Sequence, residues 1–269
     1  MTQHDALSGS VALVIGCASG IGAASARVLG ARGARVVLAD LDAEGAERGA
    51  EAIVSAGGEA VAVRCDVADE SQVAAAVARA VDQWGRLDVL HNNAAAMNLV
   101  RDDGLVADAD IDHWDATFRV NLRGQMLGCK HALPAMIGGG GGSIINTASV
   151  SGMVGDLVTS AYGAAKAGTV QLTRSVATQN GRHGVRCNAV IPGLIQVDRG
   201  PGRGMAPEKR ELMLAHQVLP FSGVADDVAN VVAFLAGTES RFITGQALVV
   251  DGGLSIHMPT YAELQRLTG

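Results

Sequence analysis

Aromatic and basic residues are scarce in this sequence. Phenylalanine, tryptophan and tyrosine together make up 3% of the 269 residues, and the formal net charge is −6 at pH 7. Proteins that bind nucleic acid or anionic membranes by charge carry a basic patch, and no such patch or Arg-rich run is present. The composition therefore argues against nucleic acid and membranes as partners.

Cysteine pairs and long apolar runs are also missing. The four cysteines stand far apart without a CxxC pair or a nearby cluster of histidines, so we expect buried reduced thiols, with no metal site and no disulfide. No segment reaches the roughly 18 apolar residues of a membrane span, and the first residues lack the basic start of a signal peptide. We expect a cytoplasmic protein. The cysteines are Cys17, Cys65, Cys129 and Cys187.

Short runs rich in Val, Ile and Leu alternate with Ala-rich helical patterns along the whole chain. Strands are expected at 10–16, 34–40, 59–67, 86–94, 138–150, 184–193 and 245–253. Helices are expected at 20–33, 43–56, 69–85, 110–136, 158–180 and 225–236. This alternation predicts an α/β fold of the Rossmann type, a doubly wound parallel sheet of about seven strands with helices on both faces. Without a linker or repeat, residues 1–269 are expected to form one domain.

The segment 194–220 interrupts the alternation with glycine, proline and charged residues, followed by a short helix near 207–217. Long insertions in a compact domain are usually functional or disordered. We interpret this one as a lid over the active site.

The first strand is followed by the turn "IGCASGIG", which contains Gly16, Gly20 and Gly22. Glycines let the backbone approach a pyrophosphate closely, and the N–H groups at a helix start favour its charge. Asp40 ends the second strand 18 residues after Gly22, where a carboxylate would bind the adenosine ribose and repel a 2′-phosphate. Because "LADLD" holds no Arg or Lys, and Ser19 stands where a basic residue would help, the sequence favours NAD over NADP.

Two further polar motifs, "CDV" at 65–67 and "NNA" at 92–94, follow the third and fourth strands. The carboxyl ends of the strands form the ligand-binding edge of an open α/β sheet. Ordinary turn and capping roles for Asp and Asn are the alternative.

These motifs and those that follow occur in the order of a known family. They are "GCASGIG", "CDV", "NNA", "VNL" at 120–122, "NTAS" at 146–149, "YGAAK" at 162–166, "IPG" at 191–193 and "ITGQALVVDGG" at 243–253. From Ser10 to about Ser255 the chain resembles the short-chain dehydrogenases/reductases in their compact form. The chain differs from the family pattern at Ile15 and Val197, where Thr is usual, and at Ala95, where Gly is usual. Val197 lacks a hydroxyl that would reach the nicotinamide amide.

The resemblance implies a catalytic tetrad of Asn121, Ser149, Tyr162 and Lys166. Helix residues four apart share a face, so Lys166 is expected beside Tyr162. A free phenol has a pKa of about 10, and a neighbouring ammonium would lower it, so that Tyr162 could act as acid and base. Ser149 would bind the substrate oxygen, and Asn121 would hold a water that links Lys166 to solvent. Judged alone, "YGAAK" is more typical of an ordinary amphipathic helix with an exposed Lys and a half-buried Tyr, and the full set of motifs reverses this interpretation.

Two sets of binding residues are expected. The cofactor set is Gly16, Ser19, Gly20, Ile21, Gly22, Asp40, Leu41, Asp66, Val67, Asn93, Ala94, Tyr162, Lys166, Pro192, Gly193 and Ile195. The substrate set is Val150, Met153, Leu157, Leu194, Met205 and Met213. The substrate set is mostly apolar and flexible, which suits a hydrophobic or cyclic alcohol, although plain core packing would explain it as well.

We therefore expect an NAD-dependent oxidoreductase that transfers a hydride between a secondary alcohol or ketone and nicotinamide. Reduction of 3-oxoacyl thioesters is the rival activity, and a non-catalytic NAD(H)-sensing protein is the rival class. The partner is a small-molecule substrate, and the family resemblance implies a homotetramer.

Overall fold

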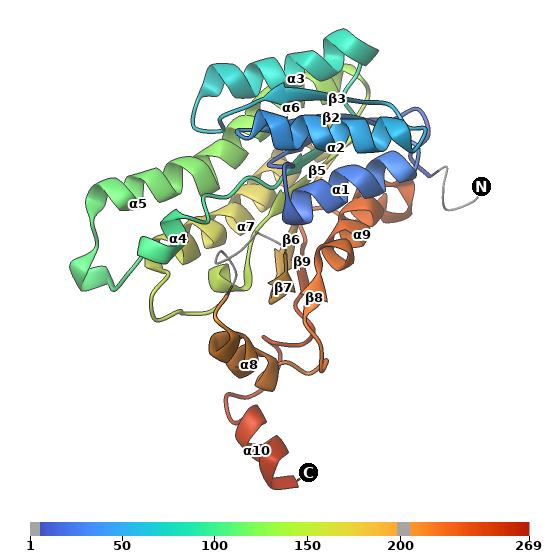
Figure 1. Ribbon diagram of the computed structural model, residues 1–269. Coiled ribbons are helices and arrows are strands. Elements are labelled where there is room, and N and C mark those ends of the chain that lie inside the picture. The colour runs from blue at the N-terminus through green and yellow to red at the C-terminus, as the bar shows by residue number, and fades with distance from the viewer. Residues whose placement is uncertain (1–5, 198–204, 269) are drawn as a thin grey trace.

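The computed structural model describes residues 6–197 and 205–268 (Figure 1). Within these residues, seven parallel strands form one sheet in the order β3-β2-β1-β4-β5-β6-β9. The predicted doubly wound parallel sheet is confirmed. The strands are β1 (Val11–Ile15), β2 (Arg35–Asp40), β3 (Ala60–Arg64), β4 (Val89–Asn92), β5 (Gly142–Thr147), β6 (Val185–Pro192) and β9 (Ala247–Val250).

Helices of the described residues cover both faces of the sheet (Figure 1). On one face lie α1 (Gly20–Ala31), α2 (Ala43–Ser55) and α9 (Ala225–Ala236). On the other lie α3 (Glu70–Trp84), α6 (Gly124–Gly138) and α7 (Ser160–Asn180). Strand β1 is buried on both sides, with Ala12 and Val14 in one core and Leu13 in the other. Its continuous apolar run is explained by this double burial.

The predicted continuous helix over 110–136 is wrong in one respect, because a turn of π-helix interrupts it. The chain forms α5 (Ile111–Phe118), then the π turn η3 (Arg119–Arg123), then α6. Turns of this kind often occur at functional sites. The other short elements are α4 (Leu99–Asp102), η2 (Val106–Asp108), η4 (Val150–Gly152), η5 (Gly181–His183) and η6 (Thr238–Ser240).

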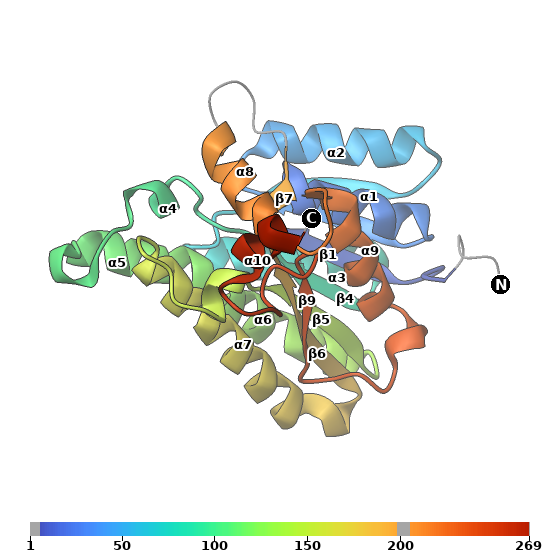
Figure 2. The ribbon, with the colours of Figure 1, turned by 90° about the horizontal axis from the view of Figure 1, so that it is seen from below.

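Residues 198–204 of the predicted lid lie outside the described residues. In the rest of 194–220 and just beyond it, β7 (Ile195–Gln196) pairs with β8 (Gly223–Val224), and α8 (Pro207–Ala215) confirms the short helix. The chain ends in α10 (Tyr261–Thr268), in front of the sheet beside α8 when the molecule is seen from below (Figure 2). Between them, the His257 ring stacks on Tyr261 at 4.3 Å and bonds to the carbonyl of His216.

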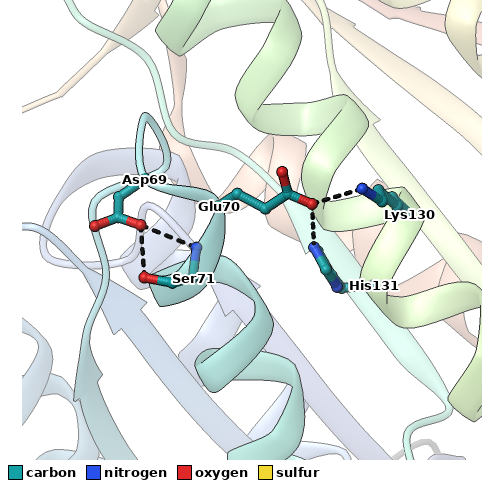
Figure 3. A network of polar contacts seen from close by, with 5 residues as sticks. All are labelled: Asp69, Glu70, Ser71, Lys130 and His131. Atoms are coloured by element: carbon teal, nitrogen blue, oxygen red, sulfur yellow. Dashed lines mark hydrogen bonds and ion pairs between the residues drawn. The ribbon is translucent and has the colours of Figure 1, made fainter.

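A polar cluster joins α3 to α6 across 60 residues of sequence (Figure 3). Asp69 caps α3 by accepting a hydrogen bond from Ser71 N. The next carboxylate, Glu70, accepts bonds from Lys130 Nζ at 2.6 Å and from His131 Nε2 at 3.1 Å. The cluster fixes the start of α3 against α6, near the carboxyl edge of the sheet.

The four cysteines are buried and free, as expected. A search of the helices in the described ranges finds none that combines the length and the apolar character needed to cross a membrane.

Candidate active site

The carboxyl ends of β1 and β4 mark the place where the strand order reverses. These neighbouring strands pair Ile15 with Asn92, so the residues that follow them, Gly16 and Asn93, stand side by side. The Asn93 side chain joins the two ends, because its Nδ2 donates to the carbonyl of Gly16 at 2.7 Å. Ligands of open α/β sheets bind in the crevice at this reversal point.

The glycine turn has the backbone that an anion site requires. Gly16 has φ +86° and Gly20 has φ +57°, and a Cβ on Gly16 would overlap the backbone of Ala94. Ser19, the N-cap residue of α1, makes no side-chain bond to the helix, whereas aspartates cap the starts of α2, α3 and α5. The first N–H groups of a helix lack intrahelical acceptors, so the start of α1 fits a pyrophosphate.

Asp40 is held rigidly at the end of β2. Its Oδ2 accepts from Ala18 N at 2.8 Å and its Oδ1 from Asp42 N at 3.0 Å, which ties the carboxylate to the glycine turn. Sequence reasoning missed Arg64, because it is far from Asp40 in the sequence. The pairing of β2 with β3 places it opposite Asp40. The guanidinium of Arg64 donates to Gln72 at 3.0 Å.

Tyr162 and Lys166 lie on one face of α7, as their spacing predicts. Lys166 is fully buried, its Nζ donates to the carbonyl of Thr147 at 2.8 Å, and it lies 5.5 Å from the centre of the Tyr162 ring. Burial lowers the pKa of the Lys166 ammonium to about 7. A lysine and a phenol are thus brought together at the carboxyl end of β5.

Glycines on α7 let two other segments approach this pair. A Cβ on Gly163 would lie 2.8 Å from the carbonyl oxygen of Ser151, and a Cβ on Gly168 would lie 2.8 Å from the Leu122 side chain. Turn η4, which follows Ser149, therefore rests against the first turns of α7. Turn η3, which contains Asn121, rests against the helix beyond Lys166.

Asn121 is fully buried in the π turn. Its Nδ2 donates to the carbonyl of Thr117 at 3.1 Å, while its Oδ1 has no hydrogen-bond partner among the described residues. Ser149 follows β5 and is partly exposed, and its hydroxyl accepts from Ser151 N at 3.2 Å. The four predicted tetrad residues therefore lie in η3, in α7 and in the turn after β5.

A buried chain of polar groups under the site was missed by sequence reasoning. Thr147 donates its hydroxyl proton to Asn93 Oδ1 at 3.2 Å. Since a hydroxyl has one proton, the contact of His91 Nε2 with the same oxygen at 2.9 Å is a donation from the histidine. Burial lowers the pKa of His91 to about 3, so the imidazole is neutral. His91 directly precedes "NNA" and Thr147 lies within "NTAS", so their place in the sequence is the signal that could have found them.

The remaining cofactor candidates cluster at the same edge of the sheet. Asp66 accepts from Ala68 N at 2.9 Å in the turn after β3, and Gly193 N donates to the carbonyl of Val250 at 3.0 Å after β6. Leu41 is exposed. The others, which lie in α1, after β3 and β4, or around the end of β6, are Ile21, Gly22, Val67, Ala94, Pro192 and Ile195.

The substrate candidates divide into two groups. Leu194 is buried, and Val150 packs on a small core that includes Ala189 and Ile191. Met213 is partly buried on α8. The others are exposed, Leu157 to 81%, Met153 to 48% and Met205 to 43%. Leu105, Val106 and Val154 are further exposed apolar side chains that sequence reasoning missed.

Comparison with known proteins agrees with this geometry. A family model described as enoyl-(acyl carrier protein) reductase matches residues 16–255. The cis-4-hydroxycyclohexanecarboxylate dehydrogenase of Sinomonas cyclohexanicum is 42% identical, over 93% of this chain and 98% of that protein. The 7α-hydroxysteroid dehydrogenase of Bacteroides fragilis is 37% identical, over 93% and 96%. A crystal structure of a Burkholderia xenovorans protein described as a short-chain dehydrogenase/reductase is 37% identical and has a TM-score of 0.85. The match covers 94% of this chain and 98% of that one.

The chain is a member of the short-chain dehydrogenase/reductase family. The residues matched by the family model include the glycine turn, the "NNA" and "NTAS" motifs and the helix that holds Tyr162 and Lys166. This short-chain dehydrogenase/reductase is an oxidoreductase.

Proposed function

We propose that this short-chain dehydrogenase/reductase oxidises a hydrophobic or cyclic secondary alcohol, or reduces the matching ketone, with Tyr162 as acid and base. The observation that carries the proposal is the buried Lys166 beside the Tyr162 ring, with Nζ 5.5 Å from the ring centre. NAD bound at the crevice would supply the nicotinamide that accepts or returns the hydride.

The residues on α7 and β5 explain how a proton would be moved. A phenol with a pKa of about 10 is a poor base near pH 7 unless its anion is stabilised. When Lys166 is protonated, it provides positive charge within a buried setting, where charge interactions are stronger than in water. The Ser149 hydroxyl would hold the substrate oxygen while Tyr162 takes or returns its proton.

Asn121 would help to connect the proton-transfer site with solvent. Its buried Oδ1 has no partner among the described residues, and a buried acceptor of this kind is usually satisfied by water. We assign it to a water that connects Lys166 with solvent.

The choice of NAD rests on Asp40. Its carboxylate is held by two backbone N–H groups at the end of β2, which fixes a negative charge where a 2′-phosphate would lie. Two nearby guanidinium groups are engaged elsewhere: Arg64 binds Gln72, and Arg48 lies 3.9 Å from the Asp42 carboxylate. Replacing Asp40 by Ser is expected to reduce the preference for NAD over NADP by at least about tenfold in kcat/KM.

The substrate class rests on exposed apolar side chains in the segments around α7. Met153 and Leu157 precede the helix, and Met205 lies in the lid. Large apolar side chains that remain exposed are compatible with a surface that binds an apolar partner. The steroid and cyclohexane substrates named for two relatives are of the same chemical class. We also propose that the chain works as a homotetramer, which light scattering on the purified protein would test.

Tyr162→Phe tests the reaction, with Tyr261→Phe as the matched control because the chain has no other tyrosine. We expect a screen of secondary alcohols with NAD to give NADH absorbance for the wild type and the control, and at least a roughly thousandfold lower kcat for Tyr162→Phe. Turnover that survives Tyr162→Phe would refute the proposed role. Activity confined to 3-oxoacyl thioesters with NADPH would favour the rival enzyme. NAD binding without turnover of any substrate would favour a sensing protein.

A further inference from the structure

We propose that Asp103 is a positioning residue that holds Tyr162 in its working place from a distant segment of the chain. The inference rests on the proposed function of Tyr162 as acid and base. Asp103 follows α4, between the cofactor side of the site and the helix α5. It belongs to none of the recognised motifs.

The start of α7 is capped from outside the helix. The residue at the usual capping position, Thr159, makes no side-chain bond to the helix. Asp103 takes its place: its Oδ2 accepts from Tyr162 N at 2.9 Å and its Oδ1 from Ala161 N at 3.2 Å, across 59 and 58 residues of sequence. The neighbouring Gly104 carbonyl accepts from the Ser160 hydroxyl at 2.9 Å.

These bonds act on the backbone of the proposed catalytic tyrosine itself. Tyr162 is the third residue of α7, within the turn whose N–H groups have no intrahelical acceptor. A carboxylate at this place satisfies those groups and complements the positive end of the helix dipole. Lys166 has a separate anchor, the carbonyl of Thr147. Loss of Asp103 would therefore move Tyr162 relative to Lys166, while leaving Lys166 held.

Asp103 also joins α7 to the segment between β4 and α5. Its own segment begins at Asn93, whose side chain is bonded to the glycine turn, and continues into the exposed Leu105 and Val106. The acceptors at Asp103 and Gly104 thus fix α7 to the segment that leads from the glycine turn to Leu105 and Val106. Its charge and its two acceptor oxygens suit this role, since both N–H groups are bound at once.

The test compares Asp103→Ala, Asp103→Asn and Asp88→Ala in the full chain. Asp88 is the matched control: it also accepts a backbone N–H, from Val11 at 2.8 Å, but it lies just before β4 at the opposite end of the sheet. We expect Asp103→Ala to lower kcat by about 10- to 100-fold, as misplacement by about 1 Å can do, with KM for NAD unchanged within about twofold. Asp103→Asn keeps one acceptor oxygen and should recover kcat to within about threefold of the wild type. Asp88→Ala should lower Tm without this loss of kcat.

Amide hydrogen exchange gives a readout that does not depend on turnover. Asp103→Ala should lose protection at Ala161 and Tyr162, whereas Asp88→Ala should keep it. An unchanged kcat in Asp103→Ala, or an equal loss of kcat in Asp88→Ala, would overturn the positioning role. Unchanged protection at the two amides would do the same. Absence of turnover in the wild type would instead overturn the proposed function, whatever the exchange data show.

Discussion

Replacing Lys166 by methionine is expected to stabilise the folded chain and to abolish turnover. The lysine is fully buried, and its pKa falls from 10.5 to about 7 because burial disfavours the charged ammonium. A folded-state pKa below the unfolded one means that the unfolded chain binds more protons between these values. Lys166 therefore destabilises the folded state at neutral and acidic pH, and the effect fades as the pH rises toward 10.5.

The magnitude follows from the two pKa values of Lys166. The cost is about 5 kcal/mol at pH 6 and about 2 kcal/mol at pH 9. Methionine removes this cost but also the bond to the carbonyl of Thr147, worth about 1 kcal/mol. That carbonyl keeps Gln125 Nε2 as a second donor at 3.0 Å, so it is not left unpaired. The net gain is about 4 kcal/mol at pH 6 and about 1 kcal/mol at pH 9.

Urea unfolding at pH 6, 7.5 and 9, followed by tryptophan fluorescence at one protein concentration, measures this gain. Lys209→Met on the exposed surface of α8 is the control and should show no such trend with pH. A stability difference that does not change with pH, or a Lys166→Met variant that is less stable than the wild type at pH 6, would refute the reasoning. Loss of NAD-dependent turnover in the same variant completes the prediction.

Two further changes test the packing under the site. Gly163→Ala should lower stability by about 1–3 kcal/mol and reduce kcat, because the added Cβ would lie 2.8 Å from the Ser151 carbonyl. Gly138→Ala, which meets open space, is the control in thermal melts and steady-state assays. The His91→Gln variant should unfold at a lower pH than the wild type. The pKa of His91 is about 3 in the folded state and 6.5 ordinarily, so the folded wild type loses stability as the pH falls below 6.5. Acid titration followed by circular dichroism measures this, and an unchanged acid midpoint would contradict it.

The strands, the faces of α7 and the glycine turn were predictable because their signals are local. A buried parallel strand such as Val11–Ile15 has a continuous apolar run, and a spacing of four brings Lys166 beside Tyr162 on any helix. The order of the motifs along the chain indicates the family. The predicted sheet, the family and the buried cysteines are confirmed, while the catalytic roles and the NAD preference stay predictions for the assays above.

The rest was decided by contacts between segments that lie far apart in the chain. The π turn that holds Asn121 breaks a pattern that reads as one helix. Arg64 comes opposite Asp40 only through strand pairing, and Asp103 reaches Tyr162 across 59 residues. Such contacts depend on the register and spacing of whole elements, which no local window contains. The sequence by itself determined the elements and the chemistry they carry, and the tertiary structure decided which buried groups hold that chemistry in place.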